Sequence, residues 1–172
     1  LFVVIYIVMK YNNKIPTVKN IGFGSNFHYH NKLGLDKAYD SNNKLYVEDD
    51  TLFVAGTSNL QDAWDDLKIP LGLTRYSQRY QDADKILNEN PQVKNIVGHS
   101  AGSAVSDELS KRYTDKNLKT TLYGSPFVDF TGKQSENRYR HSGDVISIFD
   151  RGAKTVNLGL VSPFKAHGYD QY

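Results

Sequence analysis

One junction constrains the fold of this chain more than any other feature: "NIVGHSAGSAV", where a short apolar run meets a helical pattern at a serine between two glycines. A strand that turns sharply into a helix leaves no room for Cβ atoms beside the turning residue, which is itself held in a strained conformation. Gly98 and Gly102 provide that room, and Ser100 would carry an exposed hydroxyl. Because Gly-x-Ser-x-Gly is short enough to arise by chance, the rest of the chain has to decide whether Ser100 is a nucleophile.

Strand and helix patterns alternate around this junction, from residue 44 to the end of the chain. β-rich runs separated by an acidic turn predict a hairpin, and apolar residues spaced by four, three and four predict a helix that stops before Pro91. The predicted elements are strands at 45–47 and 51–55, a helix at 74–90, a strand at 93–97, a helix at 101–113, and strands near 118–123, around Asp144 and within "KTVNLGL".

This alternation favours a three-layer α/β fold with a mostly parallel central sheet. Right-handed crossovers would bring the loops that follow the strands, including Ser100, to one rim of that sheet. We expect a single domain over residues 1–172. Within it, residues 1–43 are predicted to form an irregular lead-in with one or two short strands, and residues 44–172 the core that carries the catalytic residues.

Composition narrows the classes of function. The formal net charge of +2 is too small to indicate a nucleic-acid partner, and the absence of cysteine excludes disulfides and thiolate metal sites. The opening run "LFVVIYIVM" is shorter than a bilayer-spanning helix, which needs about 20 residues. We interpret it as a buried strand, the remnant of a signal or anchor segment, or a product of where translation was assumed to begin, with Met9 as the true initiator.

A serine hydroxyl attacks a carbonyl efficiently only when a base takes its proton and an acid orients that base. On a strand–turn–helix junction of this kind the base follows the acid in the chain, and the histidines beyond Ser100 are His141 and His167. We prefer His167, which follows the last predicted strand in a short loop that contains glycine. His141 lies in an alternating strand pattern and would need an upstream carboxylate, such as Asp129 or Glu136.

Asp144 is the preferred acid, because it follows a predicted strand and a glycine and would present its carboxylate at a strand end; Asp129 and Asp150 are the alternatives. The oxyanion formed by attack on a carbonyl needs preorganised N–H donors. One donor is the backbone N–H of Ala101 at the start of the predicted helix. The second is expected from Thr57, whose N–H and hydroxyl follow the strand in "FVAGT".

With these residues identified, the chain resembles the class 3 lipase family, the fungal-lipase type of α/β-hydrolase. Four blocks are similar to that family in the same order: "LFVAGT", "DAWDDL", "VGHSAGSA" and "LYGSPFV". Two later blocks, "RYRHSGDVIS" and "AHGY", are similar to the segments that carry the acid and the histidine. The resemblance covers residues 52–169, which is most of the chain.

Carried over residue by residue, the resemblance implies five functional residues: Ser100 as nucleophile, Asp144 as acid, His167 as base, and Thr57 and Ala101 as oxyanion donors. It implies a serine hydrolase of carboxylic esters, above all lipid esters, that requires no metal or organic cofactor. Two positions depart from the family pattern. Ala101 replaces a leucine without removing a backbone donor, whereas Ser103 replaces a glycine and adds a side chain where helix and strand pack closely.

The implied partner is a lipid or other ester substrate. A protein that acts on such a substrate would also be able to contact a membrane surface peripherally. The segments between the matched blocks are short, so only residues 69–73 would serve as a lid. The sequence leaves the oligomeric state and the compartment open, including secretion and association with a virion. Acyl chains would bind to apolar side chains near the rim of the sheet, for which the candidates are Trp64, Ile69, Leu71, Leu73 and Phe127.

Two other functions stay open at this point. The same three side chains would serve a phospholipase, or an acyltransferase that passes the acyl group to an acceptor other than water. From a different class, the chain would be a catalytically inactive lipid-binding or structural module of a larger assembly.

The remaining histidines and four basic residues are interpreted as having no role in catalysis. His99 is expected to pack under the junction, and His28 and His30 are expected to be strand neighbours on one face without a metal ion. Four basic residues are interpreted as ordinary surface charges: Arg138, Arg140, Arg151 and Lys154.

Overall fold

Within the described part of the chain, the central feature of the fold is a six-stranded sheet in which the spatial order of the strands equals their order in the sequence. The structure, a computed structural model, describes residues 25–57, 74–126, 137–148, 150, 152–156, 166–169 and 172. Strand β1 (Leu45–Glu48) pairs antiparallel with β2 (Thr51–Val54), and each later strand is parallel to the one before it. The later strands are β3 (Asn95–His99), β4 (Lys119–Tyr123), β5 (Asn137–His141) and β6 (Lys154–Val156).

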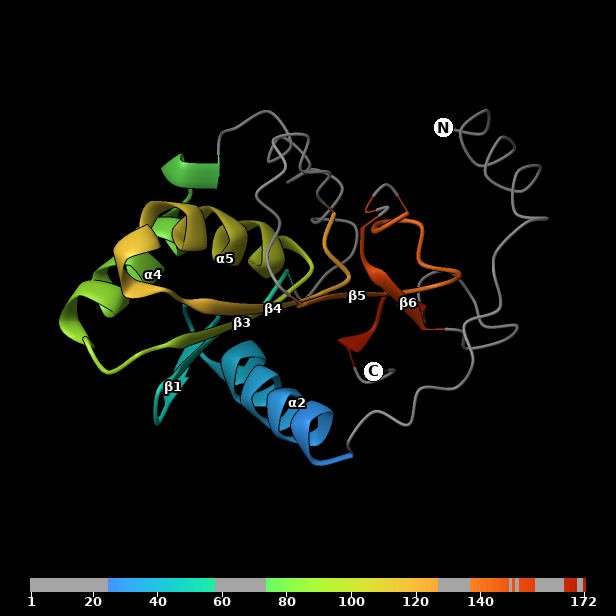
Figure 1. Ribbon diagram of the computed structural model, residues 1–172, viewed down its shortest axis with the longest axis horizontal. Helices are drawn as coiled ribbons and strands as arrows, with labels where there is room; N and C mark the ends of the chain where they lie inside the picture. The colour runs from blue at the N-terminus through green and yellow to red at the C-terminus, as the bar shows by residue number, and fades with distance from the viewer. Residues whose placement is uncertain are drawn as a thin grey trace.

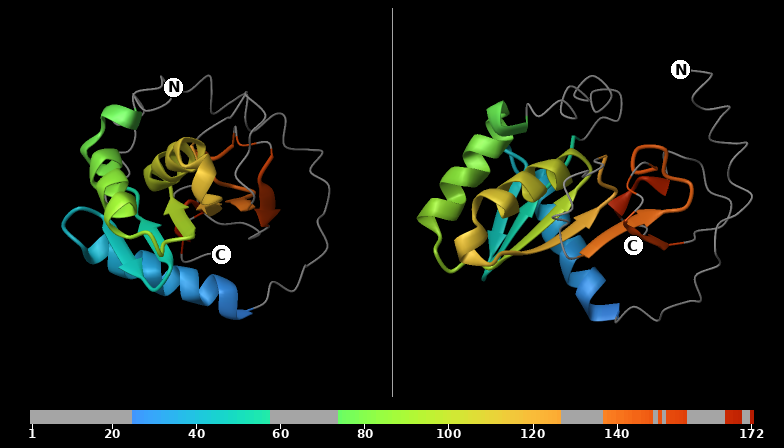
Figure 2. Two further views of the ribbon diagram at one scale, coloured as in Figure 1. Left: turned by 60° about the vertical axis from the view of Figure 1, so that its left-hand side comes forward. Right: turned by 45° about the horizontal axis from the view of Figure 1, so that its top comes forward.

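Helices cover both faces of this sheet (Figure 1). Helices α4 (Gln78–Glu89) and α5 (Ala101–Arg112) lie on one face, and α2 (Ser25–Asp40) crosses the other, as the turned views also show (Figure 2). Strands that advance in one direction through right-handed crossovers place their connecting helices on a single face, as observed for α4 and α5. The predicted three-layer α/β arrangement with a mostly parallel sheet is therefore confirmed.

Each face of the sheet has its own apolar core. Leu52 and Val54 belong to the core shared with α4 and α5, whereas Phe53 belongs to the core shared with α2. Side chains alternate between faces along a strand, so a central strand must be apolar on both sides to serve both cores. Strand β2 therefore contains a continuous apolar run, and this run is the feature that predicts the strand from the sequence.

Helix α4 starts at a side-chain cap. The Ser77 hydroxyl oxygen accepts a hydrogen bond from the Tyr80 N–H, and Tyr80, Ala83 and Leu87 form its buried stripe. The sequence predicts one continuous helix from Thr74, but Thr74–Tyr76 form a separate 3₁₀ turn, η2, because the cap at Ser77 begins a new helix. A second 3₁₀ turn, η3 (Thr114–Lys116), follows α5.

The prediction of an irregular lead-in is wrong for residues 25–40, which form helix α2 and contribute to a core. The sequence hides this helix because its buried face is chemically mixed. Apolar periodicity, the main signal for an amphipathic helix, is absent when a glycine and an amide occupy half of that face. The buried stripe consists of Asn31, Gly34, Leu35 and Ala38, at the spacing of one helix face.

The two atypical members of this stripe have specific partners. The buried amide of Asn31 donates a hydrogen bond to the Tyr123 hydroxyl at 3.0 Å, which gives this polar group a partner within the protein. Gly34 allows a close approach between α2 and β2, since a Cβ at this position would overlap the Phe53 ring. Helix α2 therefore packs directly on the sheet although its sequence is not strongly apolar.

His28 and His30 lie on α2, so the expectation that they are strand neighbours on one face is wrong. Residues two apart on a helix point in different directions. The Nδ1 atom of His28 lies 2.8 Å from the Tyr123 hydroxyl, whereas His30 is exposed.

Several predictions concern parts of the chain outside the described residues. These are the opening run at 1–9 and the lid at 69–73, together with the acyl-binding candidates Trp64, Ile69, Leu71, Leu73 and Phe127. Within the ranges that the structure describes, every helix is too short or too polar to cross a bilayer.

Candidate active site

Ser100 stands at the turn from β3 into α5 in a strained conformation. Its φ of 54° and ψ of −127° form a combination that residues with a Cβ rarely adopt. The Ser100 N–H donates to the Tyr123 carbonyl oxygen at 2.9 Å, which ties the turn to β4. A Cβ on Gly102 would overlap the Val54 carbonyl oxygen, so this glycine lets α5 start against the backbone of β2. The sharp strand-to-helix turn predicted from the sequence is present.

Ser103, which departs from the family pattern, fits this turn through a hydrogen bond. It is fully buried, and its hydroxyl donates to the Tyr123 carbonyl oxygen at 3.1 Å. The same oxygen accepts the Ser100 N–H, and a carbonyl oxygen has lone pairs for both bonds. The additional side chain therefore attaches the first turn of α5 to β4 instead of disturbing it.

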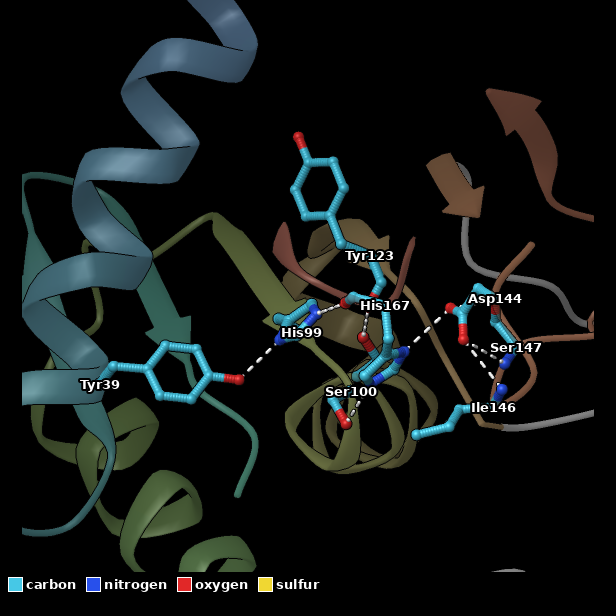
Figure 3. Close-up of polar contacts among 9 residues, drawn as sticks. Tyr39, His99, Ser100, Tyr123, Asp144, Ile146, Ser147 and His167 are labelled. Carbon is cyan, nitrogen blue, oxygen red and sulfur yellow. Dashed lines mark hydrogen bonds and ion pairs between the residues drawn. The ribbon is translucent and has the colours of Figure 1, made fainter. Parts of the chain in front are cut away.

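Three side chains from distant parts of the chain meet beside this turn (Figure 3). His167 Nε2 lies 2.9 Å from Ser100 Oγ, and His167 Nδ1 lies 2.9 Å from Asp144 Oδ2. Because an ionised carboxylate only accepts hydrogen bonds, Nδ1 carries the proton and Nε2 offers its lone pair to the serine hydroxyl. Ser100 is 4% exposed, so the expectation of an exposed hydroxyl is wrong. Asp144 and His167 are each 2% exposed, and water therefore screens the contacts among these three side chains weakly.

Asp144 follows β5 in a turn that holds its carboxylate in place. Its Oδ1 accepts hydrogen bonds from the N–H groups of Ile146, at 2.9 Å, and Ser147, at 3.3 Å, and the Ser147 hydroxyl donates to Oδ2. Burial alone would raise the pKa of Asp144. The hydrogen bond and charge of His167, with the bonds from Ser147 and Ile146, outweigh burial and hold that pKa below its ordinary value. Asp144 is therefore ionised at neutral pH and oriented toward His167.

The other candidates for acid and base lie in different surroundings. Asp150 is buried and forms an ion pair with Arg138 at 3.0 Å, so its carboxylate is engaged in a structural contact. Arg138 is 7% exposed, which makes the interpretation of this residue as a surface charge wrong. His141 is buried with its ring 4.0 Å from the Tyr172 ring, measured between centroids. The two upstream acids lie outside the described residues: Asp129 and Glu136.

The predicted oxyanion donors are Ala101, which follows Ser100 in the chain, and Thr57, which follows Gly56. Ala101 is the first residue of α5, where backbone N–H groups have no partner within the helix. Gly56 lies so close that a Cβ on it would be 2.7 Å from Ser100 Cβ, which brings the next residue, Thr57, alongside the serine. The Gly56 N–H donates to the Tyr39 hydroxyl at 3.1 Å, and the amide that follows it in the chain is that of Thr57.

Gly124 is a residue of this site that sequence reasoning missed. Its φ of +55° lies in the left-handed region, which favours glycine. A Cβ built on it would lie 3.1 Å from His167 Cε1 and Nδ1 and 3.3 Å from Asp144 Oδ2. Gly124 therefore leaves space for the hydrogen bond between His167 and Asp144. The available signal was a glycine directly after the predicted strand in "LYGSP".

Replacing Gly124 with alanine is expected to lower ester turnover by about 10- to 100-fold, because the new methyl group displaces the His167 ring from Asp144. Steady-state kinetics with a p-nitrophenyl ester would measure kcat, and thermal unfolding would confirm that the variant folds. Gly152→Ala, at an exposed position, is the matched control. An unchanged kcat for Gly124→Ala would mean that His167 keeps its place without help from this glycine.

The chain has no match among protein-family models, curated proteins or solved structures. Among the described residues, no three histidine or carboxylate side chains gather as metal ligands. A buried serine on a strained turn, with an imidazole at its hydroxyl and an ionised carboxylate behind that imidazole, is an arrangement suited to deprotonating an alcohol.

Proposed function

We propose that this protein is a serine hydrolase that cleaves carboxylic esters through an acyl-enzyme. The observation that carries the proposal is the position of His167, whose two ring nitrogens lie 2.9 Å from Ser100 Oγ and from Asp144 Oδ2. A serine hydroxyl is a weak nucleophile by itself, and these two contacts supply it with a base and with an acid that orients the base. The strained turn at Ser100, at the end of a parallel strand, supports the same interpretation and an α/β-hydrolase-like fold.

In the first half of the proposed reaction, His167 Nε2 takes the proton of Ser100 as the serine oxygen attacks the ester carbonyl carbon. The negative charge that forms on the carbonyl oxygen is stabilised by the N–H groups of Thr57 and Ala101. Asp144 stabilises the imidazolium. The ester C–O bond then breaks, and the alcohol leaves with the proton from His167.

The second half repeats these roles with water as the nucleophile. His167 takes a proton from water, the hydroxide oxygen attacks the acyl-enzyme, and the bond to Ser100 Oγ breaks as the serine regains its proton. The products are an acid and an alcohol. All protons and electron pairs are accounted for by the substrate, water and the side chains named, so the proposed reaction needs no cofactor.

Lipid esters are the proposed substrate class, on the resemblance of the sequence to class 3 lipases. Cleavage of one phospholipid chain, or transfer of the acyl group to an alcohol, would use the same side chains and differ only in the products. A lipid-binding module without turnover is less well supported. Such a module has no requirement for a carboxylate that orients His167, and yet Asp144 lies at hydrogen-bond distance from His167 and this bond helps to lower the pKa of Asp144.

A fluorophosphonate probe, which phosphonylates activated serines, tests this proposal. We expect one adduct on the native protein, located by mass spectrometry on the peptide that contains Ser100, and none on the heat-unfolded protein. A panel of p-nitrophenyl esters, triacylglycerol and phosphatidylcholine, with analysis of the released products, would then define the substrate class. Absence of both adduct and turnover, combined with tight binding of lipid vesicles, would contradict the hydrolase and favour the binding module.

A further inference from the structure

The segment that carries His167 is packed on helix α2, on the face of the sheet opposite α5. The ring of Tyr169 stacks on that of Tyr39, with 4.9 Å between centroids and 7° between planes. The Tyr169 hydroxyl donates to Asp36 Oδ1 at 2.7 Å. The base of the proposed reaction is therefore attached to an element that contributes no side chain to the reaction itself.

A chain of three hydrogen bonds joins α2 to the loops on both sides of Ser100. The Gly56 N–H donates to the Tyr39 hydroxyl at 3.1 Å. That hydroxyl lies 2.6 Å from His99 Nδ1, and His99 Nε2 lies 2.8 Å from the His167 carbonyl oxygen (Figure 3). The chain thus starts beside the Thr57 amide and ends at the backbone of the proposed base.

Only one arrangement of protons satisfies every group in this chain when His99 is neutral. A carbonyl oxygen can only accept, so the His99 proton must be on Nε2. Nδ1 of His99 is then an acceptor, and the Tyr39 hydroxyl must donate to it. The oxygen of that hydroxyl still has a lone pair, which accepts the Gly56 N–H. The His167 carbonyl oxygen therefore requires this His99 tautomer, and the Tyr39 hydroxyl stabilises it by donating to Nδ1.

The protonation states that this arrangement requires are stable near neutral pH. Burial, with the nearby His167, lowers the pKa of His99 to about 3, so this ring stays neutral. Burial also raises the pKa of Tyr39 to about 12, so its hydroxyl keeps the proton that it donates. Neither group changes charge over the range in which esterases are assayed.

We propose that Tyr39 is a positioning residue: its hydroxyl stabilises the His99 ring in the tautomer that donates to the His167 backbone, and it also holds the Gly56 amide beside the predicted oxyanion donor. This inference rests on the proposed esterase function for its catalytic consequence. Among the described residues, Tyr39 forms no hydrogen bond with the side chain of Ser100, Asp144 or His167. It acts by linking the base and the oxyanion segment to one rigid helix.

Replacing Tyr39 with phenylalanine removes the hydroxyl and keeps the ring stacked on Tyr169. We expect kcat for a p-nitrophenyl ester to fall about tenfold while KM stays unchanged. The reason is that His99 Nδ1 loses its buried hydrogen-bond partner, which lowers the population of the correctly positioned site by about tenfold. Tyr46→Phe is the matched control, since the Tyr46 hydroxyl also bonds a residue of α2, Lys37, but lies outside the chain to His99. A wild-type kcat for Tyr39→Phe would overturn the inference and leave the proposed function intact.

Substitutions at His99 separate positioning from a general loss of packing. His99→Gln keeps an N–H that can reach the His167 carbonyl and has no tautomer to select, whereas His99→Phe has no donor. We expect His99→Phe to lower kcat at least as much as Tyr39→Phe, and His99→Gln to restore most of it. Tyr39→Phe should lower kcat less in the His99→Gln background than in the wild type. Equal losses in the two backgrounds would show that Tyr39 does not act through His99.

Nitrogen NMR of the imidazole rings tests the chain without reference to activity. In the wild type we expect a neutral His99 with its proton on Nε2 from pH 5 to 9, and in Tyr39→Phe a shifted Nδ1 resonance, because that nitrogen loses its hydrogen-bond donor. A His99 that titrates near its ordinary pKa, or carries its proton on Nδ1, would overturn the inference even if a variant failed to fold. A wild type with this tautomer but with no serine adduct and no turnover would instead reject the proposed function.

Discussion

Replacing Ser100 with alanine is expected to lower kcat for ester hydrolysis by about a millionfold and to abolish the fluorophosphonate adduct. The reason is that no acyl-enzyme forms without Ser100 Oγ, the atom that His167 Nε2 contacts at 2.9 Å. The remaining groups would only orient water near a bound ester. Burst kinetics with a p-nitrophenyl ester and mass spectrometry of the probe-treated variant measure the two effects.

Ser110→Ala is the matched control for Ser100→Ala. Ser110 also lies on α5, and its hydroxyl bonds the Asp107 carbonyl oxygen, away from His167. Its kcat and its labelling should equal those of the wild type. Persistence of turnover or of the adduct in Ser100→Ala would remove Ser100 from the nucleophile role and with it the proposed mechanism.

Replacing Asp144 with asparagine is expected to lower kcat by about ten thousandfold. The amide oxygen can keep the bonds from the Ile146 and Ser147 N–H groups, which leaves the amide nitrogen to face His167 Nδ1. An N–H donor at this place favours a lone pair on Nδ1 and a proton on Nε2. In that tautomer His167 has no lone pair with which to take the proton of Ser100.

The control for this substitution is Asp84→Asn. Asp84 accepts a hydrogen bond from the Tyr113 hydroxyl at 2.8 Å, on the α4 and α5 side of the sheet and apart from the three converging side chains. It should retain wild-type kcat. If Asp144→Asn were folded and nearly as active as the wild type, another group would have to hold the base, and the assignment of Asp144 would be wrong.

The parts of the fold that were predictable from the sequence have local causes. The turn at Ser100 needs an apolar strand before it and glycines around it. Both features stand within a few residues of Ser100 in the sequence. The structure brings the three predicted side chains Ser100, Asp144 and His167 into contact. Their catalytic roles, and those of the predicted oxyanion donors, stay predictions until activity is measured.

The features that escaped prediction depend on contacts between distant parts of the chain. Helix α2 was hidden because Asn31 and Gly34 occupy its buried face, where only the tertiary partners Tyr123 and Phe53 make them suitable. Tyr39 carries no local pattern either, and a glycine after a strand did not by itself reveal the role of Gly124, since both roles depend on atoms that other segments bring close. Arg138 was assigned to the surface because a buried guanidinium is expected only where a carboxylate such as Asp150 is available.

The contact of Gly34 with the Phe53 ring bears on how this protein tolerates change. Tyr39 lies five residues further along helix α2. The distance from its hydroxyl oxygen to His99 Nδ1 is 2.6 Å, so a small shift of the helix would break this hydrogen bond. A larger side chain at position 34 would push α2 away from the sheet and move Tyr39 away from His99. The position of the proposed base, His167, therefore depends in part on the size of the side chain at position 34. That position lies on the opposite face of the sheet from α5 and carries no charged or reactive group.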